Sequence, residues 1–267
     1  MSQPTSSREV RLVSRPVGEP LPENFALVTT TIPEPGEGEI VVRNTWMSVD
    51  PYMRGRMDDA PSYIPPFPLG AALEGSAIGE VIASRAPSVP VGAAVTHFLG
   101  RREYAVLDAS AATVVDTTPA PPAAHLGPLG TTGLTAYAAL TRTAPVREGD
   151  VVLVSAAAGA VGSVAGQPAR KLGASRVIGS AGGPDRTRKL PDVFGYDAAE
   201  ATLRGMLVSS HFDLFPEWTG KAAGRPADGS LRTEQTVVDG IEQAPAAFLG
   251  MMRGADTGKM LVRLGDH

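Results

Sequence analysis

The stretch Asp150-Val-Val-Leu-Val-Ser-Ala-Ala-Ala-Gly-Ala-Val-Gly162 joins a run of apolar residues to a turn rich in small residues. The apolar run predicts a strand of a parallel sheet that is buried on both faces. Residues Ala160–Leu172 then predict a helix, and Arg176–Gly179 predicts a second strand. Together these elements form one βαβ unit.

The turn of this unit has the A-x-x-G-x-x-G form of a dinucleotide-binding fingerprint. Phosphate oxygens need a close approach to the backbone and free N–H groups at the start of a helix, where the helix dipole favours negative charge. We therefore expect Gly159, Ala160, Val161 and Gly162 to bind the phosphates of a dinucleotide. The alternative is a glycine-rich turn between strand and helix that binds no ligand.

The residues after the second strand distinguish NAD from NADP. An acidic residue there would bond the ribose 2′-hydroxyl, whereas an arginine would accept a 2′-phosphate. The strand end at Gly179 is small and neutral, and three cations follow it: Arg186, Arg188 and Lys189. This pattern favours NADP(H), with Arg186 as the phosphate ligand; a solvated basic start of a helix is the alternative.

Composition excludes several other classes of protein. The chain has 267 residues, 43% of them hydrophobic, and a formal net charge of −4 with no long run of one sign, which argues against a nucleic-acid partner. It has no cysteine, so disulfides, thiolate zinc sites and cysteine nucleophiles are excluded. The polar start and the broken apolar stretches predict neither a signal peptide nor a membrane span. We expect a soluble cytoplasmic protein that binds small molecules and no metal.

The chain before the βαβ unit has a different character. Short β-like runs alternate with Pro/Gly turns from about Val10 to Asp116, which predicts a mostly β domain. Prolines cluster at Pro119–Pro122, where we place a boundary. The expected organisation is a β domain over residues 1–122, a nucleotide-binding domain over 123–210 and a C-terminal segment over 211–267, with a helix near Ala244–Arg253 and a strand at Lys259–Leu264.

Four motifs, read together and in order, resemble a known family. They are Val49-Asp-Pro-Tyr-Met-Arg-Gly55, Leu129-Gly-Thr-Thr-Gly-Leu-Thr-Ala-Tyr137, Ser155-Ala-Ala-Ala-Gly-Ala-Val-Gly162 and Gly254-Ala-Asp-Thr-Gly-Lys-Met-Leu-Val262. The chain resembles the zinc-independent medium-chain dehydrogenase/reductases, in the branch of prostaglandin, leukotriene, curcumin and plant double-bond reductases. The resemblance implies an α/β fold class: a GroES-like β domain, closed by the C-terminal segment, with a Rossmann domain inserted in it.

The same resemblance implies the chemistry. Zinc-dependent relatives carry a histidine where this chain has Leu73, so the usual catalytic zinc site is absent. The expected reaction is zinc-independent reduction by NADPH of the C=C bond of an α,β-unsaturated aldehyde or ketone, or of a quinone. Tyr52 would present its hydroxyl to the substrate carbonyl, although it is equally a residue that packs a loop of the β domain. Met206, Leu207 and Val208 align with a stretch beside the nicotinamide, and as side chains they read as strand core.

The pattern breaks after the second strand of the Rossmann domain. Gly195-Tyr-Asp-Ala-Ala199 is followed almost at once by Leu203, so roughly 70 residues of the family's domain are missing, at ~20–30 residues per strand–helix step. In the strand order 3-2-1-4-5-6 this deletes strands 3, 4 and 5 and leaves strand 6 without a neighbour. In addition, Pro168 lies inside the predicted helix, where we expect a kink or an early end.

Three hypotheses about function follow. The first is an active NADPH-dependent reductase. The second is a relative that binds NADP(H) but has lost its chemistry through the deletion. The third is a non-functional fragment, or an artefact of the sequence, that cannot close its sheet. The resemblance also leaves open a homodimer, since strand 6 often forms the dimer interface in this family.

Overall fold

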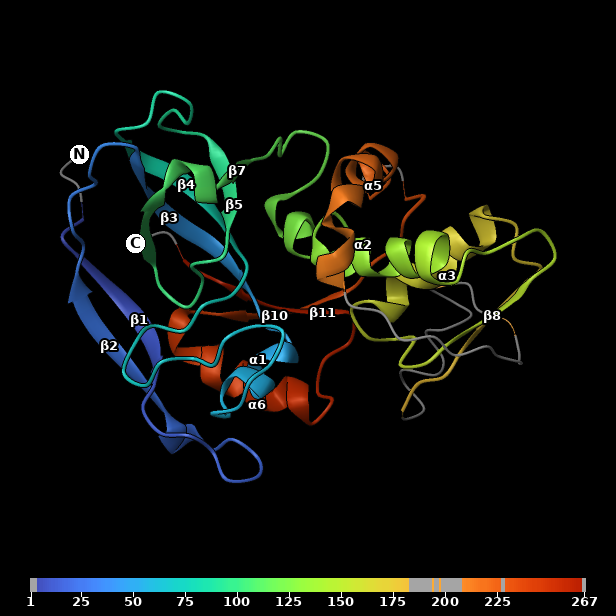
Figure 1. The fold of residues 1–267 in the computed structure, drawn as a ribbon, viewed down its shortest axis with the longest axis horizontal. Coiled ribbons are helices and arrows are strands. Elements are labelled where there is room, and N and C mark those ends of the chain that lie inside the picture. Colours follow the sequence, from blue (N-terminus) through green and yellow to red (C-terminus); the bar gives the residue numbers. More distant parts are fainter. Residues whose placement is uncertain (1–3, 183–193, 195–196, 198–207, 227–228, 266–267) are drawn as a thin grey trace. The chain divides into compact units, whose positions relative to one another are not determined.

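A computed structural model describes residues 4–182, 194, 197, 208–226 and 229–265. The chain divides into two units (Figure 1). Unit 1 comprises Met1–Thr117, Val237–Ala255 and Met260–His267, and unit 2 comprises Thr118–Thr236 and Asp256–Lys259. Residues 211–236, which the sequence analysis grouped with the C-terminal segment, therefore lie in unit 2.

Unit 1 is built around a seven-stranded sheet with the order β10-β11-β3-β4-β5-β7, in which β6 also pairs with β3. The long central strand β3 pairs with β4 along one edge, and with β6 and then β11 along the other. Apolar residues on alternate positions of these strands form two buried clusters. The strands are β3 (Glu39–Ser48), β4 (Ala77–Ser84), β5 (Ala94–His97), β6 (Tyr104–Asp108), β7 (Thr113–Val114), β10 (Gln235–Asp239) and β11 (Lys259–Arg263).

A separate antiparallel pair, β1 (Ser6–Leu12) with β2 (Phe25–Thr31), packs in the same unit together with two helices, α1 (Tyr52–Arg56) and α6 (Ala244–Met252). Short 3-10 helices cover Pro22–Asn24, Ala109–Ala111 and Ile241–Gln243. The strand and helix predicted near the C-terminus are thus present as β11 and α6. The mostly β character expected for the first part of the chain is confirmed.

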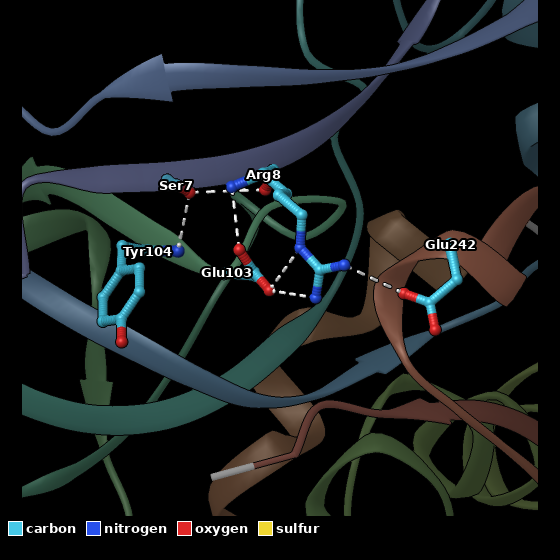
Figure 2. A network of polar contacts seen from close by, with 5 residues as sticks. All are labelled: Ser7, Arg8, Glu103, Tyr104 and Glu242. Carbon is cyan, nitrogen blue, oxygen red and sulfur yellow. Dashed lines mark hydrogen bonds and ion pairs between the residues drawn. The ribbon is translucent and has the colours of Figure 1, made fainter. Parts of the chain in front are cut away.

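An arginine–carboxylate network ties the start of the chain to two later segments (Figure 2). The Arg8 guanidinium donates to Oε1 of the buried Glu103 through Nε at 2.9 Å and Nη2 at 2.7 Å, and its Nη1 lies 3.3 Å from Glu242. Ser7 Oγ accepts from the Tyr104 backbone N–H at 3.1 Å. Since hydrogen bonds between ionised groups are short and strong, this network helps to hold β1 against β6 and the segment before α6.

Unit 2 holds the βαβ unit. Strand β8 (Val151–Val154) leads to helix α3 (Gly162–Lys171) and to β9 (Arg176–Gly179), which pairs with β8 in parallel. The helix passes through Pro168 and ends one residue before the predicted Leu172. The other elements of the unit are the 3-10 helix Pro122–Leu126, α2 (Thr131–Ala138) with its π-helical extension Ala139–Thr143, the 3-10 helix Val208–Leu214 and α5 (Phe215–Ala222).

The core of unit 2 lies between its helices and one side of the small sheet. Trp218 of α5 is fully buried, stacks on Tyr137 with ring centroids 5.1 Å apart, and donates from Nε1 to the Pro128 carbonyl at 2.7 Å. Val164 and Ala169 of α3 join the same cluster. An indole with its N–H satisfied and its rings packed anchors α5 to α2.

Strand β8 corrects one expectation. The apolar run predicted a strand buried on both faces, yet Val151 and Leu153 are 41% and 43% exposed. Among the residues that the structure describes, β9 is the only strand that pairs with β8. A parallel strand is buried on both faces only when neighbouring strand–helix steps cover it. The exposure of β8 is therefore the structural consequence of the missing steps.

Val208 corrects a second expectation. The sequence placed it at the end of a strand, but it begins the 3-10 helix Val208–Leu214 and packs, half-buried, against the core of unit 2. A strand needs a hydrogen-bonding neighbour. With the adjoining strands of the Rossmann sheet missing, this neighbour is lost.

Candidate functional site

The turn after β8 is held by its own backbone. Ala156 adopts a positive φ of 49°, and the Ala157 N–H donates to the Ser180 carbonyl at the end of β9 at 2.8 Å. Next, the Gly159 N–H donates to the Ala156 carbonyl at 2.8 Å, and the Ser163 N–H donates to the Gly159 carbonyl at 2.9 Å. These bonds place the turn at the start of α3, as the sequence predicted.

Gly162 is required by close packing inside this turn. A Cβ atom on Gly162 would lie 2.4 Å from the Ala156 oxygen and 2.6 Å from the Ala157 Cα, so that no larger residue fits without moving the backbone. A Cβ on Gly159 would lie 3.1 Å from the Ala156 oxygen alone. The fingerprint thus uses Gly162 for helix–strand packing and leaves the outer side of Gly159 open.

The N-terminus of α3 offers donors to an anion. The helix has no side-chain cap at Val161, and the backbone N–H groups of Ala160 and Val161 donate to no group in the part of the chain that the structure describes. Val161 is exposed. Unsatisfied amides at an accessible helix start suit a phosphate group, and this chemistry is present at Ala160 and Val161. The binding of dinucleotide phosphates by Gly159, Ala160, Val161 and Gly162 stays a prediction.

A segment near the C-terminus lies directly against this loop. The Gly258 N–H donates to the Ala158 carbonyl at 2.9 Å, and Gly258 forms a parallel bridge with Gly159. Gly258 has a φ of 70°, and a Cβ there would lie 2.0 Å from the Glu234 oxygen. The motif Gly254–Val262 was the sequence signal for this segment, but its contact with the loop was not predicted.

Tyr52 lies in unit 1, at the first position of α1. Its ring stacks on Phe98 with centroids 6.2 Å apart, and its hydroxyl is buried with no hydrogen-bond partner among the described residues. Burial, with the charge of Asp50 adding to it, raises the pKa of the Tyr52 hydroxyl, and the charges of Arg101 and Arg56 oppose that rise. Since buried hydroxyls are normally paired, this one is available to an acceptor that a ligand brings.

Arg101 is a residue that sequence reasoning missed. It is 2% exposed and has a positive φ of 65°. Its Nη2 lies 3.1 Å from the Met53 sulfur, and its Nη1 has no partner among the described residues. Burial lowers the pKa of Arg101 to about 10, and the charges of Asp50 and Tyr52 oppose that shift. The sequence motif Gly-Arg-Arg-Glu carries no sign that one arginine is buried.

Three of the expected cofactor ligands, Arg186, Met206 and Leu207, lie outside the described residues. Val208 is half-buried in the core of unit 2, as described above. The role predicted for each of the four stays a prediction.

His97 is held in place by its own hydrogen bonds. It is buried, its Nε2 lies 2.8 Å from Asn44 Oδ1, and its Nδ1 accepts from the Leu99 N–H at 3.0 Å. Burial, with the charge of Arg102 adding to it, lowers the pKa of His97 to about 4. In the described ranges, no group of three or more His, Cys, Asp or Glu side chains is placed to hold a metal ion.

Comparison with known proteins agrees with this architecture. Residues 8–115 match the family described as the N-terminal domain of oxidoreductase. The chain is 34% identical to the NADP(+)-dependent 2-alkenal reductase of Nicotiana tabacum, with 98% of each chain covered, and 36% identical to the NADPH-dependent curcumin reductase of Escherichia coli, with 85% of this chain and 63% of that protein covered. Its structure superposes on CurA from Vibrio vulnificus, solved in complex with NADPH, with a TM-score of 0.89 and 28% identity, covering 97% of this chain and 100% of that one.

The fold and the site define a medium-chain dehydrogenase/reductase with a GroES-like domain and a Rossmann domain. Within that class, the chain belongs to the zinc-independent branch that contains the curcumin, prostaglandin and 2-alkenal reductases. The resemblance seen in the four sequence motifs is thus confirmed.

The comparison also confirms the internal deletion. The alignment with the tobacco 2-alkenal reductase runs over 340 residues and takes in 98% of both chains, whereas this chain has 267 residues. Roughly 70 positions of the relative therefore have no counterpart here, about three strand–helix steps of a Rossmann sheet.

Among the described residues, no helix is both long enough and apolar enough to cross a membrane.

Proposed function

We propose that this protein is an NADPH-dependent reductase of the C=C bond of α,β-unsaturated aldehydes and ketones. The observation that carries the proposal is the accessible pair of amides at Ala160 and Val161 in a chain that belongs to the curcumin and 2-alkenal reductase branch. NADP(H) is the cofactor named for both of those relatives, and CurA was solved with NADPH. When bound, NADPH supplies a hydride to the electron-poor alkene.

The residues of the loop have a defined task in this proposal. The amides of Ala160 and Val161 would donate to phosphate oxygens, and Gly162 allows the helix start to pack closely against the turn at Ala156 and Ala157. Arg186 would pair with the 2′-phosphate that distinguishes NADP from NAD. No zinc site takes part in this branch of the family.

Tyr52 would act on the substrate. As the hydride arrives at the β carbon, negative charge develops on the carbonyl oxygen, and a buried hydroxyl without a partner is a ready donor to that oxygen. The Phe98 ring stacked on Tyr52 keeps the phenol oriented before the substrate arrives. Removal of one such donor typically costs about 10²–10³ in kcat.

The test is the rate of NADPH oxidation by the purified protein with a panel of enals and enones, with product analysis to show a saturated carbonyl. Turnover with NADPH, its preference over NADH, and a fall of about 100-fold in kcat for Tyr52→Phe are the expected results. A quinone added to the panel decides between the alkene and quinone classes. Absence of turnover with every compound would overturn the proposal.

One observation favours a second candidate, an NADP(H)-binding relative without turnover. Strand β8 has a single strand partner in the described part of unit 2, and two of its apolar side chains are exposed. The deletion removes the family segment that would stand beside this strand. NADPH titration separates the two candidates, because the second predicts binding of NADPH with no oxidation in the presence of any enone.

A further inference from the structure

The buried surroundings of Tyr52 hold a second group without a partner. Met53 connects the two: its Cε lies against Gly75, where a Cβ atom would be 2.4 Å away, and its sulfur lies 3.1 Å from Arg101 Nη2. A Cβ atom on the same glycine would lie 3.5 Å from the Tyr52 hydroxyl oxygen. The Tyr52 hydroxyl and the end of Met53 therefore both lie beside Gly75, and Arg101 contacts the sulfur of the same Met53.

The backbone conformation and the burial of Arg101 are both energetically unfavourable. A non-glycine residue at a φ of 65° is strained by about 1 kcal/mol or more. A buried guanidinium with an unpaired Nη1 costs more, since charged groups are normally buried only when paired. Arg101 also lines a cavity of about 10 Å³, and the other residues that line this cavity are all apolar. The charge of Asp50 offsets only part of the cost of burying Arg101, so the strain and the unpaired Nη1 point to a functional reason for keeping this cation.

The charges around Tyr52 indicate what that reason is. Asp50 lies two residues before Tyr52, and its carboxylate accepts a hydrogen bond from Ser48 Oγ. Arg56 also acts on Tyr52, but its Nη2 is paired with Glu74 at 2.7 Å, which offsets its charge. Arg101 is therefore the cation that balances the field of Asp50 at the phenol. Without it, Asp50 would disfavour any negative charge that develops next to the Tyr52 hydroxyl.

We propose that Arg101 is a positioning residue for reduction: its buried charge, held at Met53, makes the Tyr52 hydroxyl a better donor to the oxyanion that forms on the substrate. This inference rests on the proposed function. In the reaction the substrate gains a hydride from NADPH at the β carbon, the electron pair of the C=C bond moves to give an enolate, and a proton from water then saturates the α carbon. Arg101 touches neither substrate nor cofactor in this account; it acts through Tyr52.

The test is a double-mutant cycle between the two residues. Arg101→Gln removes the charge, Arg101→Lys keeps it, and each is combined with Tyr52→Phe. We expect Arg101→Gln to lower kcat roughly tenfold with KM nearly unchanged, because the effect is felt when charge develops. Arg101→Lys should restore kcat to within about threefold of wild type. In the Tyr52→Phe background the effect of Arg101→Gln should disappear, since the group through which Arg101 acts is gone.

Arg56→Met is the matched control, because Arg56 is equally buried but already neutralised by Glu74. Its effect on kcat should be smaller than that of Arg101→Gln, because Glu74 already offsets the charge of Arg56 at the phenol. Melting curves of all variants identify any that fail to fold, and Arg101→Lys keeps the test valid if the neutral variant does. An equal loss of kcat from Arg101→Gln with and without Tyr52 would show a purely structural role and overturn the inference.

A second readout does not depend on turnover. 4-Nitrophenolate, an oxyanion with a visible absorption band, serves as a probe of the Tyr52 region in the presence of saturating NADP⁺. Arg101→Gln is expected to weaken its binding about tenfold, and Arg101→Lys to leave it close to wild type. Equal affinity in wild type and Arg101→Gln would overturn the inference. If the wild-type protein turns over no enone, the proposed function fails, and this binding difference still decides whether Arg101 favours an oxyanion.

Discussion

The apolar strands of the two units differ in their burial. In unit 1, β3 has hydrogen-bonded neighbours along both edges, and Ile40, Val42 and Met47 are fully buried. In unit 2, the equally apolar β8 pairs with β9 alone among the described strands, and Val151 and Leu153 are exposed. The difference shows that an apolar strand sequence does not determine burial by itself; the neighbouring strands and helices must be present to cover it.

What unit 2 keeps is equally informative. The turn after β8 is fixed by bonds within a single βαβ unit, such as that from Ala157 to Ser180, and needs none of the missing strands. The conformation of this turn is therefore kept in a unit that lacks the other strands of a Rossmann sheet. Four changes, taken from the largest expected effect to the smallest, test this contrast between an intact unit 1 and a reduced unit 2.

The largest effect is expected from Gly162→Ala. The new Cβ atom would lie 2.4 Å from the Ala156 oxygen, so the loop must move and the amides of Ala160 and Val161 lose their alignment. NADPH affinity, measured by fluorescence titration, should fall by about 100-fold, and unit 2 should lose about 2 kcal/mol of stability. Gly220→Ala in α5 is the control, because a Cβ there meets nothing within 4 Å. Unchanged affinity in Gly162→Ala would contradict the role given to the loop.

The next largest effect concerns unit 1 and pH. His97 is buried and neutral, with a pKa lowered to about 4, whereas in the unfolded chain it titrates near its ordinary value. As pH falls below about 6.5, His97 is protonated in the unfolded state but stays neutral in the folded state. The free energy of unfolding therefore decreases until about pH 4, where the folded state is protonated too. The loss amounts to up to about 3 kcal/mol. Urea unfolding of wild type and His97→Gln at pH 7 and pH 5 measures this loss. If the free energy of unfolding falls equally in both proteins between the two pH values, His97 is not the group responsible.

A smaller effect, of opposite sign, is expected in unit 2 from Pro168→Ala. Pro168 lies in the interior of α3 and cannot donate to the carbonyl one turn before it, whereas alanine can. We expect a gain of about 1–3 kcal/mol, seen as a rise in the melting temperature of the transition that carries the Trp218 signal. A loss of stability would show that the packing of the buried proline ring outweighs the missing hydrogen bond.

The smallest expected effect, at Val151, belongs to a matched pair of strand substitutions. Val81→Thr in β4 places a hydroxyl in the fully buried core of unit 1 and should cost about 1–3 kcal/mol. Val151→Thr makes the same change on the exposed strand β8 and should alter stability by no more than about 0.5 kcal/mol. Chemical denaturation of both variants gives the comparison. Equal costs at the two positions would show that β8 is covered in solution.

Much of this fold could be predicted because its signals are local. The periodicity and turn residues around Gly159 specify the βαβ unit within a residue or two, and Arg176–Gly179 was placed as found. Relative to the family, the chain lacks a long segment between Gly195 and Leu203. This difference predicts the loss of strands that leaves β8 with one described neighbour.

The rest depends on contacts between residues far apart in the chain. The burial of Arg101 against Met53, the contact of Gly258 with Ala158, and the pairing of Arg8 with Glu103 arise only when distant segments meet. No local pattern distinguishes Arg101 from the neighbouring Arg102. The family resemblance predicts a strand that ends at Val208, because it assumes that the neighbouring strands are present. Without them Val208 begins a 3-10 helix.

The central claim is that the βαβ unit that remains still binds NADPH and still supports reduction. Its most direct test is a single experiment in which NADPH is first titrated into the protein, followed by its fluorescence, and an enone is then added while NADPH absorbance is recorded. Saturable binding followed by loss of NADPH and formation of the saturated carbonyl compound is the predicted result. No saturable binding, with the protein shown to be folded by a cooperative melting transition, would contradict it.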